Sequence, residues 1–210
     1  CDLPGHGLSS GARAAIGEFA DYQVVLQGAF AQAAQLDLPQ PWHLCGQRAG
    51  GAVMLDHLLL GAVSEQIGET ILFAPLVRPR AWGWSKFSYQ MLKPFVRSIP
   101  RRFNANSNDP DFLQFIQHDP LQPLSLPTAW VGALSRWIPT IEAAPRSNRS
   151  PLIIQGDDDM TVDWRHNLEV LQAKFCAPHV LMLPGARHHL VNEIPEFRNR
   201  YFDFLRERLS

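Results

Sequence analysis

The chain has 210 residues, of which 46% are hydrophobic, and its 19 Lys and Arg residues against 20 Asp and Glu residues leave a formal net charge of −1. This length suits one domain with room for an insertion, and the balanced charge gives no indication of a nucleic-acid partner. No apolar run reaches the length of about 18 residues that spans a bilayer, so no transmembrane segment is expected.

The three cysteines, Cys1, Cys45 and Cys176, are too few and too scattered for a disulfide framework or a zinc site. No His and Glu residues have the spacing of metal ligands, so we expect neither a metal nor a cofactor. A reducing, cytoplasmic setting follows from the cysteine usage. The chain begins at Cys1 and not at Met, which indicates a truncated start.

Short apolar runs alternate with helical stretches along the chain, as in an α/β fold with a mostly parallel sheet. Apolar residues recur near helical spacing in 12–35, and Pro39 and Pro41 end that segment. Cys45 falls within the first apolar run and is expected to be buried. The strands are expected at 42–45, 70–74, 152–155 and 180–183. Further helices are expected at 52–60, 164–175 and 194–208.

The region 78–149 differs from its flanks because it is rich in Trp and Pro and has no clear strand. Short helices are expected at 82–97, 109–117 and 128–137. We interpret this region as an inserted helical cap, and 1–77 with 150–210 as the core that carries it. Its aromatic residues indicate either the small core of the cap itself or a wall that binds an acyl chain.

Three segments beside predicted strands carry the chemistry. The first, Gly46-Gln47-Arg48-Ala49-Gly50, has the glycine spacing of the nucleophile elbow G-x-S-x-G, but its central residue is Arg48. The second follows a strand and contains three acids that end at Asp159. The third follows the next strand and contains His188. The order of elbow, acid and histidine is that of α/β-hydrolase triads.

Together these segments resemble the α/β-hydrolase superfamily, and within it the monoacylglycerol lipase and lysophospholipase-like branch of serine aminopeptidase S33 type. The resemblance rests on a D-x-P-G-H-G-x-S loop at 2–9, the G-x-x-x-G-G elbow at 46–51, a G-x-x-D-x-x-V loop at 156–162 and a G-x-x-H loop at 185–188. It covers essentially the whole chain. Family members begin well before the first of these loops, so we expect a partial fold that lacks its N-terminal strands.

The resemblance implies a role for each matching residue. Asp159 corresponds to the triad acid and His188 to the triad base, while Arg48 occupies the nucleophile position. The backbone N–H of Ala49 would form half of the oxyanion hole, with Gln47 beside it as an oxyanion or substrate contact. The His-Gly loop that supplies the other half in the family is missing here.

Arginine cannot replace serine as a nucleophile, because its guanidinium stays protonated and has no lone pair to offer. We therefore expect a carboxylic ester hydrolase by descent whose activity is impaired. The expected partner is a small ester or lipid-like substrate, with peripheral contact to a lipid interface. Two alternatives remain: a non-catalytic member that binds a ligand or a protein, and a gene fragment.

Overall fold

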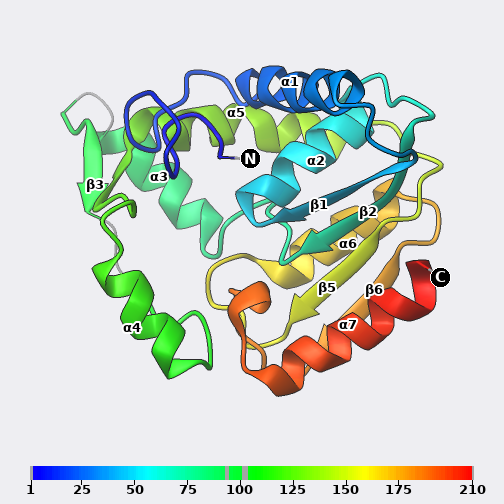
Figure 1. The fold of residues 1–210 in the computed structure, drawn as a ribbon. Coiled ribbons are helices and arrows are strands. Elements are labelled where there is room, and N and C mark those ends of the chain that lie inside the picture. The colour runs from blue at the N-terminus through cyan, green and yellow to red at the C-terminus, as the bar shows by residue number, and fades with distance from the viewer. Residues whose placement is uncertain (1, 93–94, 101–103, 210) are drawn as a thin grey trace. The chain divides into compact units, whose positions relative to one another are not determined.

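The computed structural model describes residues 2–92, 95–100 and 104–209 (Figure 1). The chain divides into two compact units. Unit 1 comprises Cys1–Leu38, Ala81–Asn104 and Phe115–Thr140, and unit 2 comprises Pro39–Arg80, Ala105–Gln114 and Ile141–Ser210. Each unit is a set of residues that contact one another more than they contact the other unit. The expected division into a core and a cap at 78–149 is a different one and stays a prediction.

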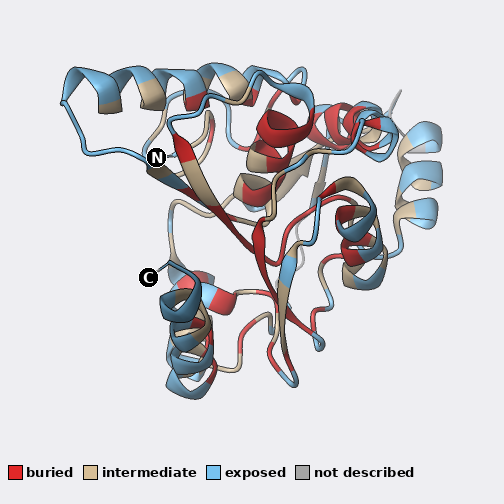
Figure 2. Cartoon of the chain, turned by 90° about the vertical axis from the view of Figure 1, so that its right-hand side faces the viewer, coloured by how far each residue is buried: buried red, intermediate tan, exposed pale blue. Residues whose placement is uncertain are grey.

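A parallel four-stranded sheet forms the centre of unit 2. Its strands in spatial order are β1 (Trp42–Gln47), β2 (Ile67–Phe73), β5 (Leu152–Gly156) and β6 (His179–Leu183). All four strands were expected from the sequence. Every residue of β5 is buried, as its uninterrupted apolar pattern predicts for an inner parallel strand (Figure 2).

Helices pack against this sheet and close its core. Unit 2 contains α2 (Ala49–Leu60), α6 (Trp164–Lys174) and α7 (Pro195–Leu209). Phe197 and Tyr201 of α7 join a buried cluster with Phe73 and Ile154 of the sheet. The rings of Phe73 and Tyr201 meet edge to face, with their centroids 5.0 Å apart. The α/β class predicted from the sequence is confirmed.

The expectation that Cys45 is buried is wrong. The residue lies in β1, the strand at one edge of the described sheet, and its side chain is exposed. Side chains of a strand point alternately to its two faces. Leu44 and Gly46 are buried, so His43 and Cys45 lie on the opposite, exposed face.

Unit 1 contains α1 (Asp21–Gln35), α3 (Trp82–Leu92) and most of α5 (Thr128–Ala143), while α4 (Pro110–His118) crosses from one unit to the other. Phe19, Tyr22 and Trp137 form its aromatic core, with the rings of Phe19 and Trp137 stacked at 4.4 Å.

Within the described residues, no helix is long and apolar enough to cross a bilayer.

Three expectations for unit 1 are wrong. The helix expected at 82–97 extends only over Trp82–Leu92, since 95–97 are not helical and 93–94 lie outside the described residues. The first helix begins at Asp21 and not at residue 12, because turns occupy 11–20 and Ala14 has a φ of +51°, outside the helical region. A two-stranded antiparallel sheet joins β3 (Ser98–Pro100) to β4 (Ser125–Pro127), where no strand was expected. Three residues are too few to show the alternation that marks a strand.

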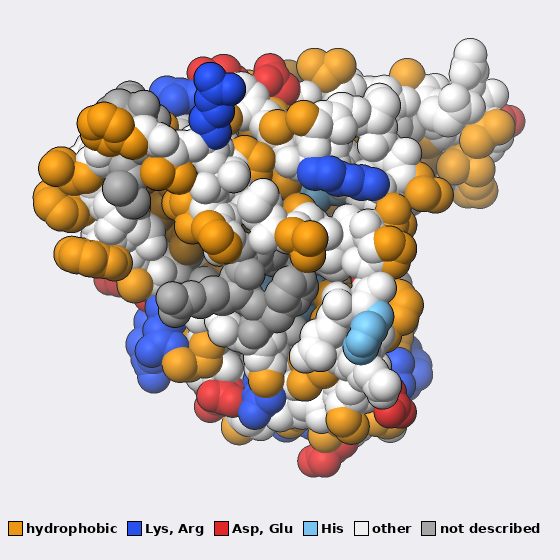
Figure 3. All heavy atoms as spheres, turned by 90° about the vertical axis from the view of Figure 1, so that its left-hand side faces the viewer, with side chains coloured by type: hydrophobic (Ala, Val, Ile, Leu, Met, Phe, Trp, Pro, Cys, Tyr) orange, Lys and Arg blue, Asp and Glu red, His pale blue; other side chains and the backbone are white. Residues whose placement is uncertain are grey.

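Hydrophobic side chains gather on the surface seen in Figure 3. In unit 1, the exposed apolar residues include Trp84, Phe87 and Met91 of α3, of which Trp84 is 72% exposed. In contrast, Trp130 and Trp137 of α5 are buried. Some aromatic residues of 78–149 therefore belong to the core, as one interpretation expected, while others are exposed. A wall that binds an acyl chain stays a prediction.

Candidate active site

The turn between β1 and α2 has the strained backbone of a nucleophile elbow. Arg48 adopts φ +50° and ψ −111°, a conformation that costs an L-residue free energy. A Cβ added at Gly46 would lie 2.7 Å from backbone atoms of Gly50 and Gly51, so this position requires glycine. The glycine spacing in the sequence therefore reports a real steric constraint, with Arg48 at its centre.

A buried acid–base pair lies beyond the carboxyl ends of β5 and β6. His188 Nδ1 is 2.8 Å from Asp159 Oδ2, and both side chains are fully buried. The other oxygen, Oδ1, accepts backbone N–H groups of Thr161 at 2.8 Å and Val162 at 3.1 Å. These contacts fix the carboxylate and orient the imidazole so that Nδ1–H donates to it. The structure brings together the two residues that the sequence paired.

The environment lowers the pKa of both members of this pair. For Asp159, burial alone raises the pKa, but the hydrogen bond and charge of His188 and the two backbone N–H groups outweigh it. For His188, burial disfavours the charged form, and the nearby positive charge of Arg48 adds to that effect against the attraction of Asp159. His188 is therefore neutral at pH 7, with its proton on Nδ1.

The Nε2 atom of His188 is buried and has no hydrogen-bond partner among the described residues. A neutral imidazole whose Nδ1 donates to a carboxylate presents a lone pair at Nε2. This atom is the one that accepts a proton in a Ser-His-Asp triad. The arrangement thus has the orientation of a general base.

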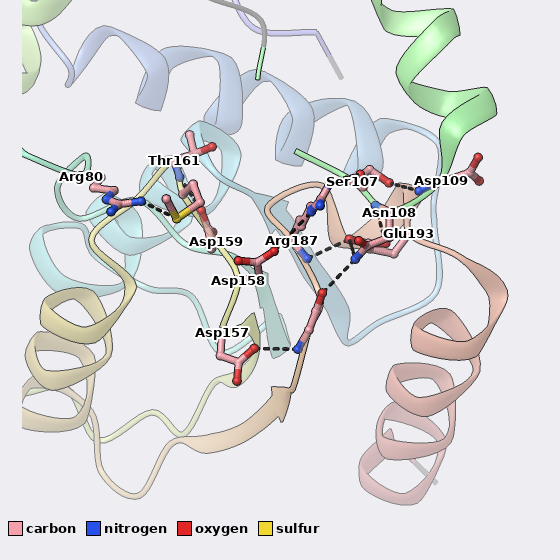
Figure 4. A network of polar contacts seen from close by, with 12 residues as sticks. Arg80, Ser107, Asn108, Asp109, Asp157, Asp158, Asp159, Thr161, Arg187 and Glu193 are labelled. Atoms are coloured by element: carbon pink, nitrogen blue, oxygen red, sulfur yellow. Dashed lines mark hydrogen bonds and ion pairs between the residues drawn. The ribbon is translucent and has the colours of Figure 1, made fainter. Parts of the chain in front are cut away.

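The three consecutive acids have separate roles (Figure 4). Asp157 Oδ1 accepts the backbone N–H of Gly185 at 2.7 Å, and Asp158 pairs with Arg187 at 3.3 Å. Only Asp159 reaches the imidazole of His188. Asp157 and Asp158 therefore fasten the histidine loop to the end of β5, which explains why three like charges occur together.

Glu193 was not singled out by sequence reasoning, although it is fully buried beside the histidine loop. Its carboxylate accepts the backbone N–H of Arg187 at 2.8 Å and that of Asn108 at 3.0 Å (Figure 4). The backbone N–H of His189 donates to the carbonyl of Asn106 at 2.7 Å. Residues 106–108 thus clamp the loop that carries His188, and only the polar run Asn106–Asp109 signals this in the sequence.

Gln47 and Ala49 flank Arg48 at the elbow. The amide Nε2 of Gln47 lies 3.4 Å from the carbonyl oxygen of His188 and 3.3 Å from His189 Nδ1. Ala49 is the first residue of α2, where backbone N–H groups have no partner within the helix. Their expected roles toward an oxyanion or substrate stay predictions.

We expect the chain to lose stability as the pH falls below about 6.5. The folded-state pKa of His188 lies below its ordinary value of 6.5, so the unfolded chain binds more protons in this window. Stability is then highest above pH 6.5 and decreases on acidification. Buried His57, whose pKa is also lowered, contributes with the same sign. The lowered pKa of Asp159 acts in a separate window, below its ordinary value of 3.8.

Urea unfolding at pH 7 and pH 5 measures this effect. The variant His188→Gln should lose part of the pH dependence and retain the part that His57 contributes. If the variant and the unsubstituted chain lose the same free energy of unfolding between pH 7 and pH 5, His188 does not contribute to the pH dependence.

Comparison with known proteins identifies the family of the chain. A family model described as serine aminopeptidase, S33, matches residues 1–195. The alpha/beta hydrolase domain-containing protein aho-3 of Caenorhabditis elegans is 29% identical over 99 residues. That match covers 45% of this chain and 30% of the worm protein.

Two solved structures share the fold. The monoacylglycerol lipase of Paleococcus ferrophilus superposes with a TM-score of 0.80 at 14% identity, over 98% of this chain and 80% of that one. A soluble variant of the monoglyceride lipase of Saccharomyces cerevisiae, in complex with a substrate analogue, also gives 0.80, at 18% identity. It covers 99% of this chain and 75% of the yeast chain.

Proposed function

This chain belongs to the serine aminopeptidase S33 family, which has the α/β-hydrolase fold, and we propose that it is by descent a carboxylic ester hydrolase. The proposed substrates are lysophospholipid- or monoacylglycerol-type esters. One observation carries the proposal: Asp159 and His188 form a fully buried pair, 2.8 Å apart. The elbow residue Arg48 is near enough for its positive charge to lower the pKa of His188.

The geometry supports a triad mechanism with one part substituted. In that mechanism His188 Nε2 takes the proton of a nucleophile at position 48 and later returns it to the leaving alcohol. Asp159 holds the imidazole and stabilises its charged form. The backbone N–H of Ala49 would stabilise the oxyanion of the tetrahedral intermediate.

Arg48 interrupts this mechanism in the chain as it stands. A guanidinium offers no lone pair to a carbonyl carbon, so no acyl-enzyme can form at this position. Loss of a triad nucleophile lowers kcat by roughly 10⁶-fold in a well-studied serine protease. We therefore propose that ester hydrolysis is impaired, and replacement of Arg48 by Ser tests the proposal directly.

A second candidate function is non-catalytic binding of a carboxylate, such as the head group of a fatty acid. The positive charge of Arg48 favours it, because this residue precedes the N-terminus of the 12-residue helix α2. Helix N-termini attract anions through their partial positive charge. A carboxylate at this position would interact with both the guanidinium and the backbone N–H groups of the first turn.

This second candidate predicts that the chain binds decanoate more tightly than decanol, and that Arg48→Gln removes the difference. The loss of one charge-assisted contact should raise the Kd for decanoate about tenfold. Isothermal titration calorimetry below the micellar concentration measures both ligands. Equal affinity for decanoate in the two proteins would contradict a role for Arg48 in binding.

Peripheral contact with a lipid interface is a further part of the proposal. Trp84, Phe87 and Met91 are exposed and lie three and four residues apart on α3, so they share one helical face. Exposed aromatic and aliphatic side chains of this kind suit the boundary between lipid and water. The cytoplasmic location expected from the cysteine usage likewise stays a proposal.

A further inference from the structure

A cavity of about 270 Å³ opens at the amino-terminal ends of β2, β5 and β6 in unit 2. Asp159 and His188 follow the carboxyl ends of β5 and β6, so the cavity lies at the opposite end of these strands. The polar residues around it include Glu69, Thr70, Arg149, Ser150, His179 and Arg208. The proposed ester hydrolysis uses none of them.

The guanidinium of Arg149 is fixed at one wall of the cavity. Its Nη1 donates to the carbonyl oxygens of Ile67 at 2.6 Å and Gly68 at 2.9 Å, and its Nη2 donates to that of Ser64 at 3.3 Å. These acceptors are neutral, so the positive charge is held in place without being neutralised. Among the described residues, Arg149 forms no ion pair with a carboxylate.

Arg208 and His179 supply further donors. Arg208 Nη1 lies 2.7 Å from His179 Nδ1. An arginine can only donate, so Nδ1 accepts this hydrogen bond and the imidazole carries its proton on Nε2. His179 therefore presents an N–H group as well, and the side chain of Arg208 keeps its charge beside it.

We propose that this cavity binds a phosphate group, either free or carried by a small molecule. The lining contains two arginines and only one carboxylate, that of Glu69, so it carries an excess positive charge. Donors on three separate segments, at Arg149, His179 and Arg208, suit a tetrahedral oxyanion better than a planar carboxylate. The volume approaches that of small-molecule sites and leaves room for a small group attached to the phosphate.

Isothermal titration calorimetry of the whole chain with inorganic phosphate, at constant ionic strength, tests the proposal. We expect saturable binding to one site, and a Kd about tenfold higher in Arg208→Ala. The matched control is Arg206→Ala on the same helix, because Arg206 pairs with Asp203 and does not line the cavity.

Two further titrations identify the ligand. Tighter binding of glycerol 3-phosphate than of inorganic phosphate would indicate a carried phosphate, and equal binding would indicate free phosphate. Acetate should bind more weakly than either. No saturable binding of phosphate, equal binding of acetate, or an equal loss in Arg206→Ala and Arg208→Ala would overturn the proposal, provided that circular dichroism shows each variant folded.

Discussion

Replacing Arg48 by Ser is expected to raise the rate of p-nitrophenyl butyrate hydrolysis by at least about 10³-fold over the unsubstituted chain. The reason is that Asp159 and His188 already have the distance and orientation of the acid and base in a catalytic triad, 2.8 Å apart and buried. A hydroxyl at position 48 would give His188 Nε2 a proton to accept. The gain stays below the roughly 10⁶-fold that a complete triad contributes, because half of the oxyanion hole is not accounted for.

Two control variants separate nucleophilic catalysis from other effects of removing a charge. Arg48→Ala also removes the guanidinium but adds no hydroxyl, so it should remain as slow as the unsubstituted chain. Arg48→Ser combined with His188→Ala should lose the gain. Equal rates in Arg48→Ser and Arg48→Ala, with both variants folded, would show that the elbow and His188 do not cooperate.

Replacing Gly156 by Ala is expected to lower the free energy of unfolding by about 3 kcal/mol. A Cβ at this position would lie 2.2 Å from the carbonyl oxygen of Ala186 and 2.9 Å from that of Arg187. Both obstacles are backbone atoms of the loop that carries His188, so they cannot move aside as a side chain would. The substitution should therefore push this loop away from β5, and urea unfolding measures the cost.

Gly50→Ala is the matched control for this substitution. Gly50 lies in the first turn of α2, in the same unit, and a Cβ there would meet no atom within 4 Å. Alanine should leave stability unchanged or raise it by up to about 1 kcal/mol, because it restricts the unfolded chain. If Gly156→Ala unfolds at the same urea concentration as Gly50→Ala, the close approach of the loop to β5 is not important for stability.

Strong local patterns made the sheet predictable from the sequence. The run Leu152–Gln155 is apolar until its end and is followed by a glycine and three acids, which is typical of an inner strand that ends at a functional edge. The expected helix at 12–35 was wrong at its start, because apolar residues such as Phe19 recur with helical spacing in a segment that forms turns. Tertiary packing, here against Trp137, accounts for the burial of Phe19.

The centre of the candidate site was also predictable, since Gly46, Asp159 and His188 occur in motifs with steric or chemical causes. Its supports were not. Glu193 acts by accepting backbone N–H groups, and any residue type can donate such a group, so no sequence pattern identifies the partners. The same holds for the cavity in unit 2, because its lining residues come from four segments that lie far apart in the chain.

The central claim is that Asp159 and His188 form a competent base that can activate a nucleophile at position 48. Covalent labelling with a fluorophosphonate, read by intact mass and peptide mapping, tests it most directly. We expect Arg48→Ser to gain one phosphonyl group on the peptide that contains position 48, and the unsubstituted chain and the double variant with His188→Ala to gain none. A folded Arg48→Ser protein that takes up no label, or labelling of the unsubstituted chain at another serine, would contradict the account.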